Sequence, residues 1–380
     1  MWSCPNCESW IIASRICPNC GAWVGDDSAD EQDSDHPVEL AIMGDTLLSC
    51  SGRKAKVVVP AGVKELEYSF YNDTALQEIE LPEDLTMILK CAFQECTALQ
   101  EIRLPDKLKR LGRAAFYGCS ALRKIEIPAS VKQINTETFR DCTALRVIEL
   151  SEGLEIIGGS VFKGCNALEK IAIPASVKQI ELEAFQDCTA LQEIRLPDGL
   201  ELIGRSAFSE CEALQEVRLP EGLKEIGSDA FSSCRSLRQI TIPAGVKCIE
   251  SGTFWKCTAL QEAHLPEELE QIGMFAFEAC DTLTRIVLPA SLKQLCRGAF
   301  ENCTSLLEAQ LPDGLEELQD DAFEYCRSLQ KVTIPAQVRQ IERAAFYYCQ
   351  SLQEVQLPEE LNEIGEDAFA HCWALKRIVI

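Results

Sequence analysis

The chain contains 380 residues, of which 47% are hydrophobic and 25% are charged. This balance is typical of folded proteins and excludes an intrinsically disordered chain. The formal net charge of −24 would repel a phosphate backbone and an anionic lipid surface, so we expect no nucleic-acid partner. No apolar run approaches the roughly 20 residues of a membrane-spanning helix, so we expect no membrane insertion.

Two Cys-x-x-Cys pairs lie near the N-terminus, Cys4 with Cys7 and Cys17 with Cys20. Two residues between thiolates let both sulfur atoms of a tight turn face one ion, and two such turns complete a tetrahedral four-sulfur shell. Residues 1–24 therefore look like a short zinc ribbon with a structural Zn²⁺. Four protein ligands leave no open position for a catalytic water. A redox pair would need βαβ surroundings that the sequence lacks, whereas iron is a second metal for such sites.

Three tryptophans, Trp2, Trp10 and Trp23, surround the cysteine pairs. They form either the small core of this module or an exposed docking surface, and the sequence favours neither. Residues 25–37 follow with six acidic residues and no basic one. Such a segment repels itself, which predicts an extended acidic linker.

Residues 38–59 alternate apolar segments with Gly-Asp and Ser-Gly pairs. This pattern predicts strand, turn, strand, turn, strand. Since the first turn of a repeat array would otherwise leave its core open, we expect this segment to be an N-terminal β cap.

Residues 60–380 are dominated by a 23-residue repeat. Phenylalanine recurs every 23 residues from Phe70 to Phe369, and a leucine follows each of them by six residues. Fixed apolar positions at a period of 20–29 residues are the signature of a leucine-rich repeat. The sequence thus predicts a mainly β repeat solenoid, a curved array of about fourteen units.

One unit illustrates the physical basis of the repeat. Ile194 and Leu196 alternate with polar residues, as in a strand with one buried face, and Pro197 then ends backbone pairing. Leu200 and Ile203 form a second short apolar segment. No unit can bury its apolar residues alone, so stacked units must share one continuous core.

A cysteine follows the repeated phenylalanine by three residues in thirteen units, from Cys96 to Cys372. We expect these thiols to point inward, one above another, as small buried side chains whose weak donor reaches a backbone carbonyl. A column of thirteen equivalent neighbours has no unique pairing. The pattern therefore predicts reduced structural cysteines, which suit a reducing compartment.

The pattern LP-x-x-L-x-x-I-G-x-x-A-F-x-x-C-x-x-L-x-x-I resembles the BspA-like leucine-rich repeats and covers about residues 57–380. The resemblance implies a curved solenoid with a role in adhesion or protein recognition, usually on a bacterial surface. The N-terminal residues lack the basic and apolar regions of a secretion signal, which predicts a cytoplasmic protein. A cell-surface or exported protein is the alternative.

The sequence stops at Ile380 within a regular unit. An unpaired apolar edge strand favours association, so we expect either self-association through this C-terminal edge or a longer natural chain. Elsewhere, the three histidines, the glycines and the carboxylates form no pattern of an active site, so the sequence predicts no enzymatic activity.

Two groups of aromatic residues occur at repeat positions where other units mostly carry polar or small residues. They are the candidate protein-binding residues. The first pairs Trp255 with Phe275, beside Met274. The second lies in the last three units and comprises Tyr325, Tyr347, Tyr348, His371 and Trp373. Scattered surface aromatics are the alternative. The outward strand positions mix charge signs, so we expect a solvated sheet face held by Glu–Arg and Glu–Lys neighbours.

These features favour a non-enzymatic scaffold that binds a protein through the solenoid and uses the zinc module as a second contact. The alternative is a bacterial adhesin or host-interaction protein at the surface or outside the cell. A zinc-ribbon regulator that binds nucleic acid is disfavoured by the charge.

Overall fold

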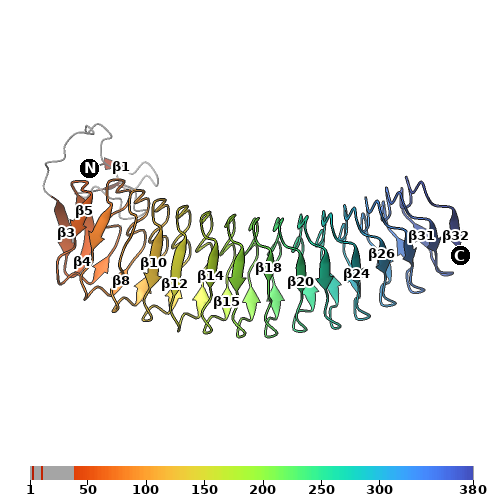
Figure 1. Cartoon of the computed structure of the whole chain (residues 1–380), viewed down its shortest axis with the longest axis horizontal. Helices are drawn as coiled ribbons and strands as arrows, with labels where there is room; N and C mark the ends of the chain where they lie inside the picture. Colours follow the sequence, from red (N-terminus) through yellow and green to blue (C-terminus); the bar gives the residue numbers. More distant parts are fainter. Residues whose placement is uncertain (1, 4–9, 12–37, 380) are drawn as a thin grey trace.

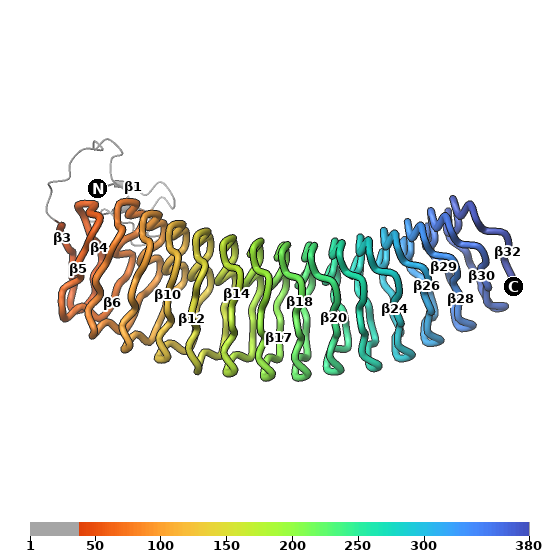
Figure 2. The backbone as a smooth tube through the Cα atoms, in the orientation of Figure 1, coloured from red at the N-terminus to blue at the C-terminus, as the bar shows by residue number. Residues whose placement is uncertain are grey.

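The structure is a computed structural model, and it describes residues 2–3, 10–11 and 38–379. From residue 38 onward the chain winds into a curved solenoid of about fifteen turns of about 23 residues (Figure 1). The N-terminal and C-terminal turns lie at opposite ends of the array (Figure 2). Near the N-terminus, β1 (Trp2–Ser3) and β2 (Trp10–Ile11) pair antiparallel. The four predicted zinc ligands and the acidic linker lie outside the described residues.

Nearly every turn contributes one short strand to each of two rows, with partners 23 residues apart, such as Lys170 with Glu193 and Gln179 with Leu202. The first row contains β5 (Lys56–Val58), β7 (Glu78–Glu80), β10 (Lys124–Ile127), β12 (Val147–Leu150), β14 (Lys170–Ala172), β16 (Glu193–Arg195), β18 (Glu216–Val217), β20 (Gln239–Thr241), β22 (Glu262–His264), β24 (Arg285–Val287), β26 (Glu308–Gln310), β28 (Lys331–Thr333), β30 (Glu354–Gln356) and β32 (Arg377–Val379).

The second row contains β4 (Thr46–Ser51), β6 (Glu65–Leu66), β8 (Met87–Ile88), β9 (Arg110–Leu111), β11 (Gln133–Ile134), β13 (Ile156–Ile157), β15 (Gln179–Ile180), β17 (Leu202–Ile203), β19 (Glu225–Ile226), β21 (Cys248–Ile249), β23 (Gln271–Ile272), β25 (Gln294–Leu295), β27 (Glu317–Leu318), β29 (Gln340–Ile341) and β31 (Glu363–Ile364). Consecutive strands in this row are parallel, as between β15 and β17. The two rows form two sides of the solenoid.

Residues 38–59, for which the sequence predicts three strands, contain β3 (Glu39–Met43), β4 and β5. β3 and β4 form an antiparallel hairpin with Gly44 between them at a φ of 67°. β4 then pairs in parallel with β6, and β5 with β7. This segment therefore supplies a first solenoid turn, while β3 covers its outer edge.

The third side of each turn has no regular strand but is held by backbone hydrogen bonds between turns. Glu183 N–H donates to Arg205 O at 2.8 Å, Phe185 N–H to Ala207 O at 2.8 Å, and Asp187 N–H to Ser209 O at 3.0 Å. Residues two positions before and after each core phenylalanine have positive φ, including 24 residues other than glycine. Each such residue costs about 1–2 kcal/mol, which the bonds between turns help to offset.

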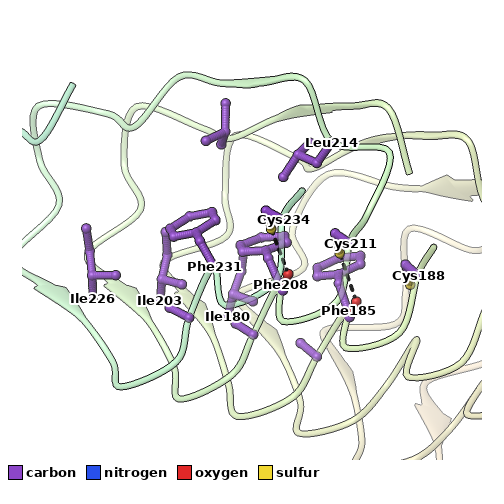
Figure 3. Close-up of a cluster of buried hydrophobic side chains, with 14 of the residues drawn as sticks. Ile180, Phe185, Cys188, Ile203, Phe208, Cys211, Leu214, Ile226, Phe231 and Cys234 are labelled. Atoms are coloured by element: carbon purple, nitrogen blue, oxygen red, sulfur yellow. Dashed lines mark hydrogen bonds between the residues drawn. The ribbon is translucent and has the colours of Figure 1, made fainter. Parts of the chain in front are cut away.

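The interior is built from columns of identical residues. The fourteen phenylalanine rings stack in one row with neighbouring centroids 5.1–5.8 Å apart. Figure 3 shows three of them, Phe185, Phe208 and Phe231. Stacked rings bury a large apolar area with favourable geometry. The predicted shared core is therefore confirmed.

Each of the thirteen column cysteines donates its thiol to the carbonyl of the phenylalanine 26 residues earlier, at 3.1–3.3 Å. Figure 3 shows two of these bonds, from Cys211 to Phe185 and from Cys234 to Phe208. The seventeen described cysteines are all free thiols. The expected contact between thiol and carbonyl is confirmed, and it ties each turn to the preceding one.

Candidate functional site

The third side of the solenoid presents the surface that we call the turn face. It comprises the residues three and two positions before, and one and two positions after, each core phenylalanine. Successive turns place equivalent side chains in columns with a spacing of about 5 Å, the distance between neighbouring strands. Six of the seven predicted contact residues belong to this face, and Trp373 lies two positions beyond it.

The structure brings the five C-terminal aromatic residues into one cluster. Tyr348 lies at its centre, with ring centroids 5.1 Å from Tyr325, 4.8 Å from Tyr347, 4.3 Å from His371 and 5.8 Å from Trp373. All four pairs are tilted or edge-to-face rather than stacked face to face, and aromatic rings favour such arrangements. These residues, which the sequence analysis grouped as candidates, therefore lie together, and we call them the C-terminal aromatic cluster.

The last described turn exposes three large apolar side chains, one of which belongs to this cluster. Trp373 is 68% exposed, Ile378 in β32 is 50% exposed and Ile364 in β31 is 48% exposed. The three tyrosines are half-buried against one another, so their rings are held in place. A rigid aromatic surface loses little side-chain entropy when another molecule covers it.

The second predicted pair forms a separate shallow hollow of about 230 Å³ that we call the tryptophan hollow. Trp255, Met274 and Phe275 line it, together with Gly252. The Trp255 indole N–H is buried, and no acceptor for it lies among the described residues. The Lys256 ammonium lies 4.0 Å from the Trp255 ring centroid, a cation–π contact that holds the ring.

Between these two patches runs a column of carboxylates that sequence reasoning missed. Glu278, Glu301 and Glu324 each follow a core phenylalanine by one position, in consecutive turns. Burial raises the pKa of Glu301 to about 7, helped by repulsion from Glu278, Glu324 and Asp321. Burial, with repulsion from Asp321, raises the pKa of Glu324 to about 6.

A buried aspartate, Asp321, contributes to the raised pKa values of Glu301 and Glu324. Its carboxylate is only 4% exposed and accepts hydrogen bonds from Arg297 at 3.0 Å and Arg343 at 3.2 Å. The charge of Asp321 repels those of Glu301 and Glu324 and so contributes to their raised pKa values. The 23-residue spacing of the glutamates was visible in the sequence, but this buried neighbour was not.

The raised pKa values predict that acid stabilises this region. A glutamate whose folded pKa lies above its unfolded value near 4.5 penalises the folded state fully above pH 7, and the penalty disappears as pH falls below that unfolded value. After discounting for solvent screening, we expect Glu301→Gln to stabilise the chain by about 1–2 kcal/mol at pH 8 and hardly at all at about pH 4.

The measurement is chemical denaturation of wild type and variant at both pH values. Glu270→Gln is the control, because Glu270 forms an ion pair with Lys293 at 2.8 Å and its pKa is lowered by that contact. If Glu301→Gln and wild type show the same change with pH, the assignment of Glu301 is wrong.

The outward strand face carries the mixed ion pairs that the sequence predicts. Lys124 contacts Glu126 at 2.6 Å and Glu149 at 3.5 Å, and Lys170 contacts Glu193 at 3.4 Å. All of these side chains are exposed, and such pairs each contribute at most about 1 kcal/mol. This face therefore resembles ordinary solvated surface more than a built site.

The described residues contain no group of three or more His, Cys, Asp or Glu side chains placed to hold a metal ion. The predicted ligands Cys4, Cys7, Cys17 and Cys20 are not among these residues. Within residues 2–3, 10–11 and 38–379 there is also no helix long and apolar enough to cross a membrane.

Comparison with known proteins accounts for the repeated framework. The model of the BspA type leucine rich repeat region matches residues 66–192, 178–306 and 270–380. The chain belongs to this BspA-type family. No curated protein matches the sequence.

Solved structures of bacterial leucine-rich-repeat proteins are similar to this BspA-type array. A leucine-rich repeat protein from Bacteroides ovatus shares 27% identity over 86% of this chain and 83% of its own, with a TM-score of 0.69. A leucine-rich cell surface protein from Faecalibacterium prausnitzii shares 27% identity over 92% and 95%, with a TM-score of 0.57. A third protein, from Eubacterium ventriosum, shares 19% identity over 89% and 93%, with a TM-score of 0.50, and shows the fold alone.

The BspA-type repeat explains the phenylalanine, cysteine and leucine columns as framework. The repeat pattern does not account for the aromatic and acidic residues of the turn face, which depart from the polar residues at equivalent positions of other turns. Leucine-rich-repeat solenoids commonly mediate protein interaction, which makes these departures the first candidates for contact residues.

Proposed function

We propose that this chain is a non-enzymatic protein-binding scaffold that contacts its partner through the C-terminal half of the turn face. The observation that supports this proposal is the C-terminal aromatic cluster. Its other four rings all contact the ring of Tyr348, and Trp373 is 68% exposed. Binding energy at protein interfaces concentrates in such tyrosine and tryptophan anchors. The tryptophan hollow supplies a second anchor on the same face.

The test is a triple variant that removes the anchors and keeps the fold. Tyr325→Ser and Tyr348→Ser place serine where Ser233 already stands with the same positive φ. Trp373→Thr places threonine where most earlier turns carry a small polar residue. Partner captured by the full chain from the native organism should fall at least about tenfold with this variant.

The control is Glu193→Ser on the exposed strand face, which should leave capture unchanged. Loss of capture with the control, or normal capture with the triple variant, would contradict a contact through the aromatic cluster. Circular dichroism of each variant checks that the solenoid is intact.

A second copy of the chain is the alternative partner, because Trp373 of the aromatic cluster presents a large exposed apolar side chain that association between copies would cover. Light scattering across a concentration series measures this directly. If a second copy is the partner, molecular mass should rise with concentration for wild type and stay at that of one chain for the triple variant.

We propose a cytoplasmic location, supported by the thirteen free thiols of the core column, since reduced cysteines suit a reducing compartment. The alternative is an exported or surface adhesin, favoured by similarity to the Faecalibacterium prausnitzii surface protein. Cell fractionation, with antibody labelling of intact cells, separates the two locations.

The N-terminal module remains part of the proposal as a structural zinc ribbon that offers a second contact. The donor set of four thiolates in two Cys-x-x-Cys pairs carries it. We expect one zinc per purified chain by elemental analysis and less than half of that in Cys17→Ser. Bound iron with visible absorption would replace zinc, and a metal content unchanged by Cys17→Ser would refute this site.

A further inference from the structure

The opposite end of the turn face carries a second hollow to which sequence reasoning gave no role. It has a volume of about 260 Å³, and we call it the tyrosine hollow. It is lined mainly by Tyr68, Tyr71, Tyr117, Lys90, Arg113 and Glu137, with Gln94, Cys91 and Ala114 between them. The described residues around it belong to the first four phenylalanine-bearing turns.

The repeat explains why the surface is hollow at this point. In the column one position after each core phenylalanine, Gln94 separates Tyr71 and Tyr117, which are therefore about 10 Å apart. In the column two positions before, Cys91 and Ala114 are small and each is only 6% exposed. Small residues thus form a floor, and aromatic rings stand on either side of it.

The polar groups at the rim are held in fixed positions by their neighbours. The Arg113 Nε–H group donates to Glu137 at 3.0 Å, and Arg140 donates to the other oxygen of Glu137 at 3.3 Å. The Arg140 guanidinium also lies 5.6 Å from the Tyr117 ring centroid. A site whose groups are already ordered loses little entropy when a ligand enters.

Lys90 is held in the same manner on the other side of the hollow. Its ammonium lies 5.6 Å from the Tyr68 ring centroid, and a hydrogen bond with Tyr68 raises the pKa of Lys90. The hollow therefore combines aromatic faces with cationic donors, a carboxylate acceptor and the amide of Gln94, which is both donor and acceptor.

We propose that the tyrosine hollow binds one neutral pyranose ring of a glycan. A pyranose has an apolar C–H face that packs against aromatic rings, and a rim of hydroxyls that each need both donors and acceptors. The volume lies below the roughly 300–1,000 Å³ of sites for drug-sized ligands, which restricts the occupant to about one ring.

Other ligand classes match these groups less well. Lys90 and Arg113 would attract an anionic ligand, but Arg113 is already paired with Glu137, and the net charge of −24 opposes the approach of an anion. A purely apolar anchor would cover Lys90, Arg113 and Glu137 without supplying partners for their polar atoms. A neutral ring with hydroxyls satisfies both the aromatic and the polar part of the lining.

The experiment is saturation-transfer NMR of the full chain with the methyl glycosides of glucose, galactose, mannose and N-acetylglucosamine. We expect transfer to the ring C–H protons of at least one sugar, with a Kd of about 1–10 mM. Tyr117→Ala should weaken this binding about tenfold, because one stacking face is lost. Ala370 stands at the equivalent position of the last turn, so alanine suits the backbone there.

A second variant fills the hollow with a larger side chain, so that it tests the site without removing any side chain that would contact the sugar. Ala114→Phe should abolish sugar binding, and Phe275 already occupies the equivalent position with a φ of 56° against 53° for Ala114. Gln186→Ala, at the equivalent position three turns further along the array, is the control and should bind sugar normally.

Three outcomes would overturn the proposal. They are no transfer to any of the four sugars, transfer that persists in Ala114→Phe, and stronger transfer to phenyl phosphate than to every sugar. The last outcome would mark the hollow as an anion site. None of them bears on the proposed protein contact, which lies at the other end of the array.

Discussion

Replacing Phe208 with alanine is expected to lower the free energy of unfolding by about 3–5 kcal/mol, the range for large aromatic residues lost from a core. Phe208 is 0% exposed, and its ring lies 5.2 Å from Phe185 and 5.3 Å from Phe231. Deleting it leaves a cavity that both neighbouring turns line, because the phenylalanine rings form one continuous row.

The consequence should spread along the array, because each turn is stable only against its neighbours. We expect hydrogen exchange to accelerate in residues 183–233 before it does so elsewhere. Denaturant unfolding gives the total loss, and exchange by mass spectrometry gives its location. A two-state analysis is justified only if both measurements change together.

Phe369→Ala is the control for this prediction. Phe369 is the last ring of the row, is only partly buried and has a single ring neighbour, Phe346, at 5.3 Å. Its loss should therefore cost clearly less than that of Phe208. Equal losses for the two variants would mean that stacking on both sides is not what stabilises the central ring.

The fold could be predicted from the sequence nearly residue by residue, because the same physical problem recurs every 23 positions. Phe208 and Cys211 are buried for the same reason as Phe185 and Cys188, so fourteen copies confirm one another. The positive φ values of the third side were not predicted. Glutamate, serine and tyrosine all occupy those positions, so residue type alone carries no signal there.

The sequence revealed a candidate site only where an unusual residue type at a single repeat position was enough to identify it. Tyr325, Tyr348 and His371 are recognisable as aromatic substitutions in a polar column, and the structure places their rings in contact. The carboxylate column and the tyrosine hollow depend on combinations across columns, such as Asp321 beneath Glu324 or Ala114 beside Tyr117. Aligning the units is not enough to find these combinations, because they arise from neighbours in different columns.

Alkylation of the native chain is expected to leave the central column cysteines at least about a hundredfold slower to react than the same cysteines in denaturant. The thiolate is the reactive form. Burial raises the pKa of Cys211, and its thiol is 0% exposed and donates to Phe185 O at 3.2 Å. Reaction therefore requires the turn to open, so its rate reports local unfolding.

The cysteine column allows a comparison between a partly exposed thiol at its end and the buried thiols at its centre. Cys372 in the last turn is 9% exposed, and burial raises its pKa only to about 11. It should react first, followed by Cys349 and then by residues nearer the centre. Timed labelling with N-ethylmaleimide and peptide mass spectrometry gives the order for residues 38–380.

Uniform rates along the column would show that the array opens as one unit, whereas a gradient from the C-terminal edge would show that turns detach in sequence. A partner that covers the C-terminal aromatic cluster should then slow Cys372 and Cys349 most, which links the proposed contact to a rate measured at named thiols.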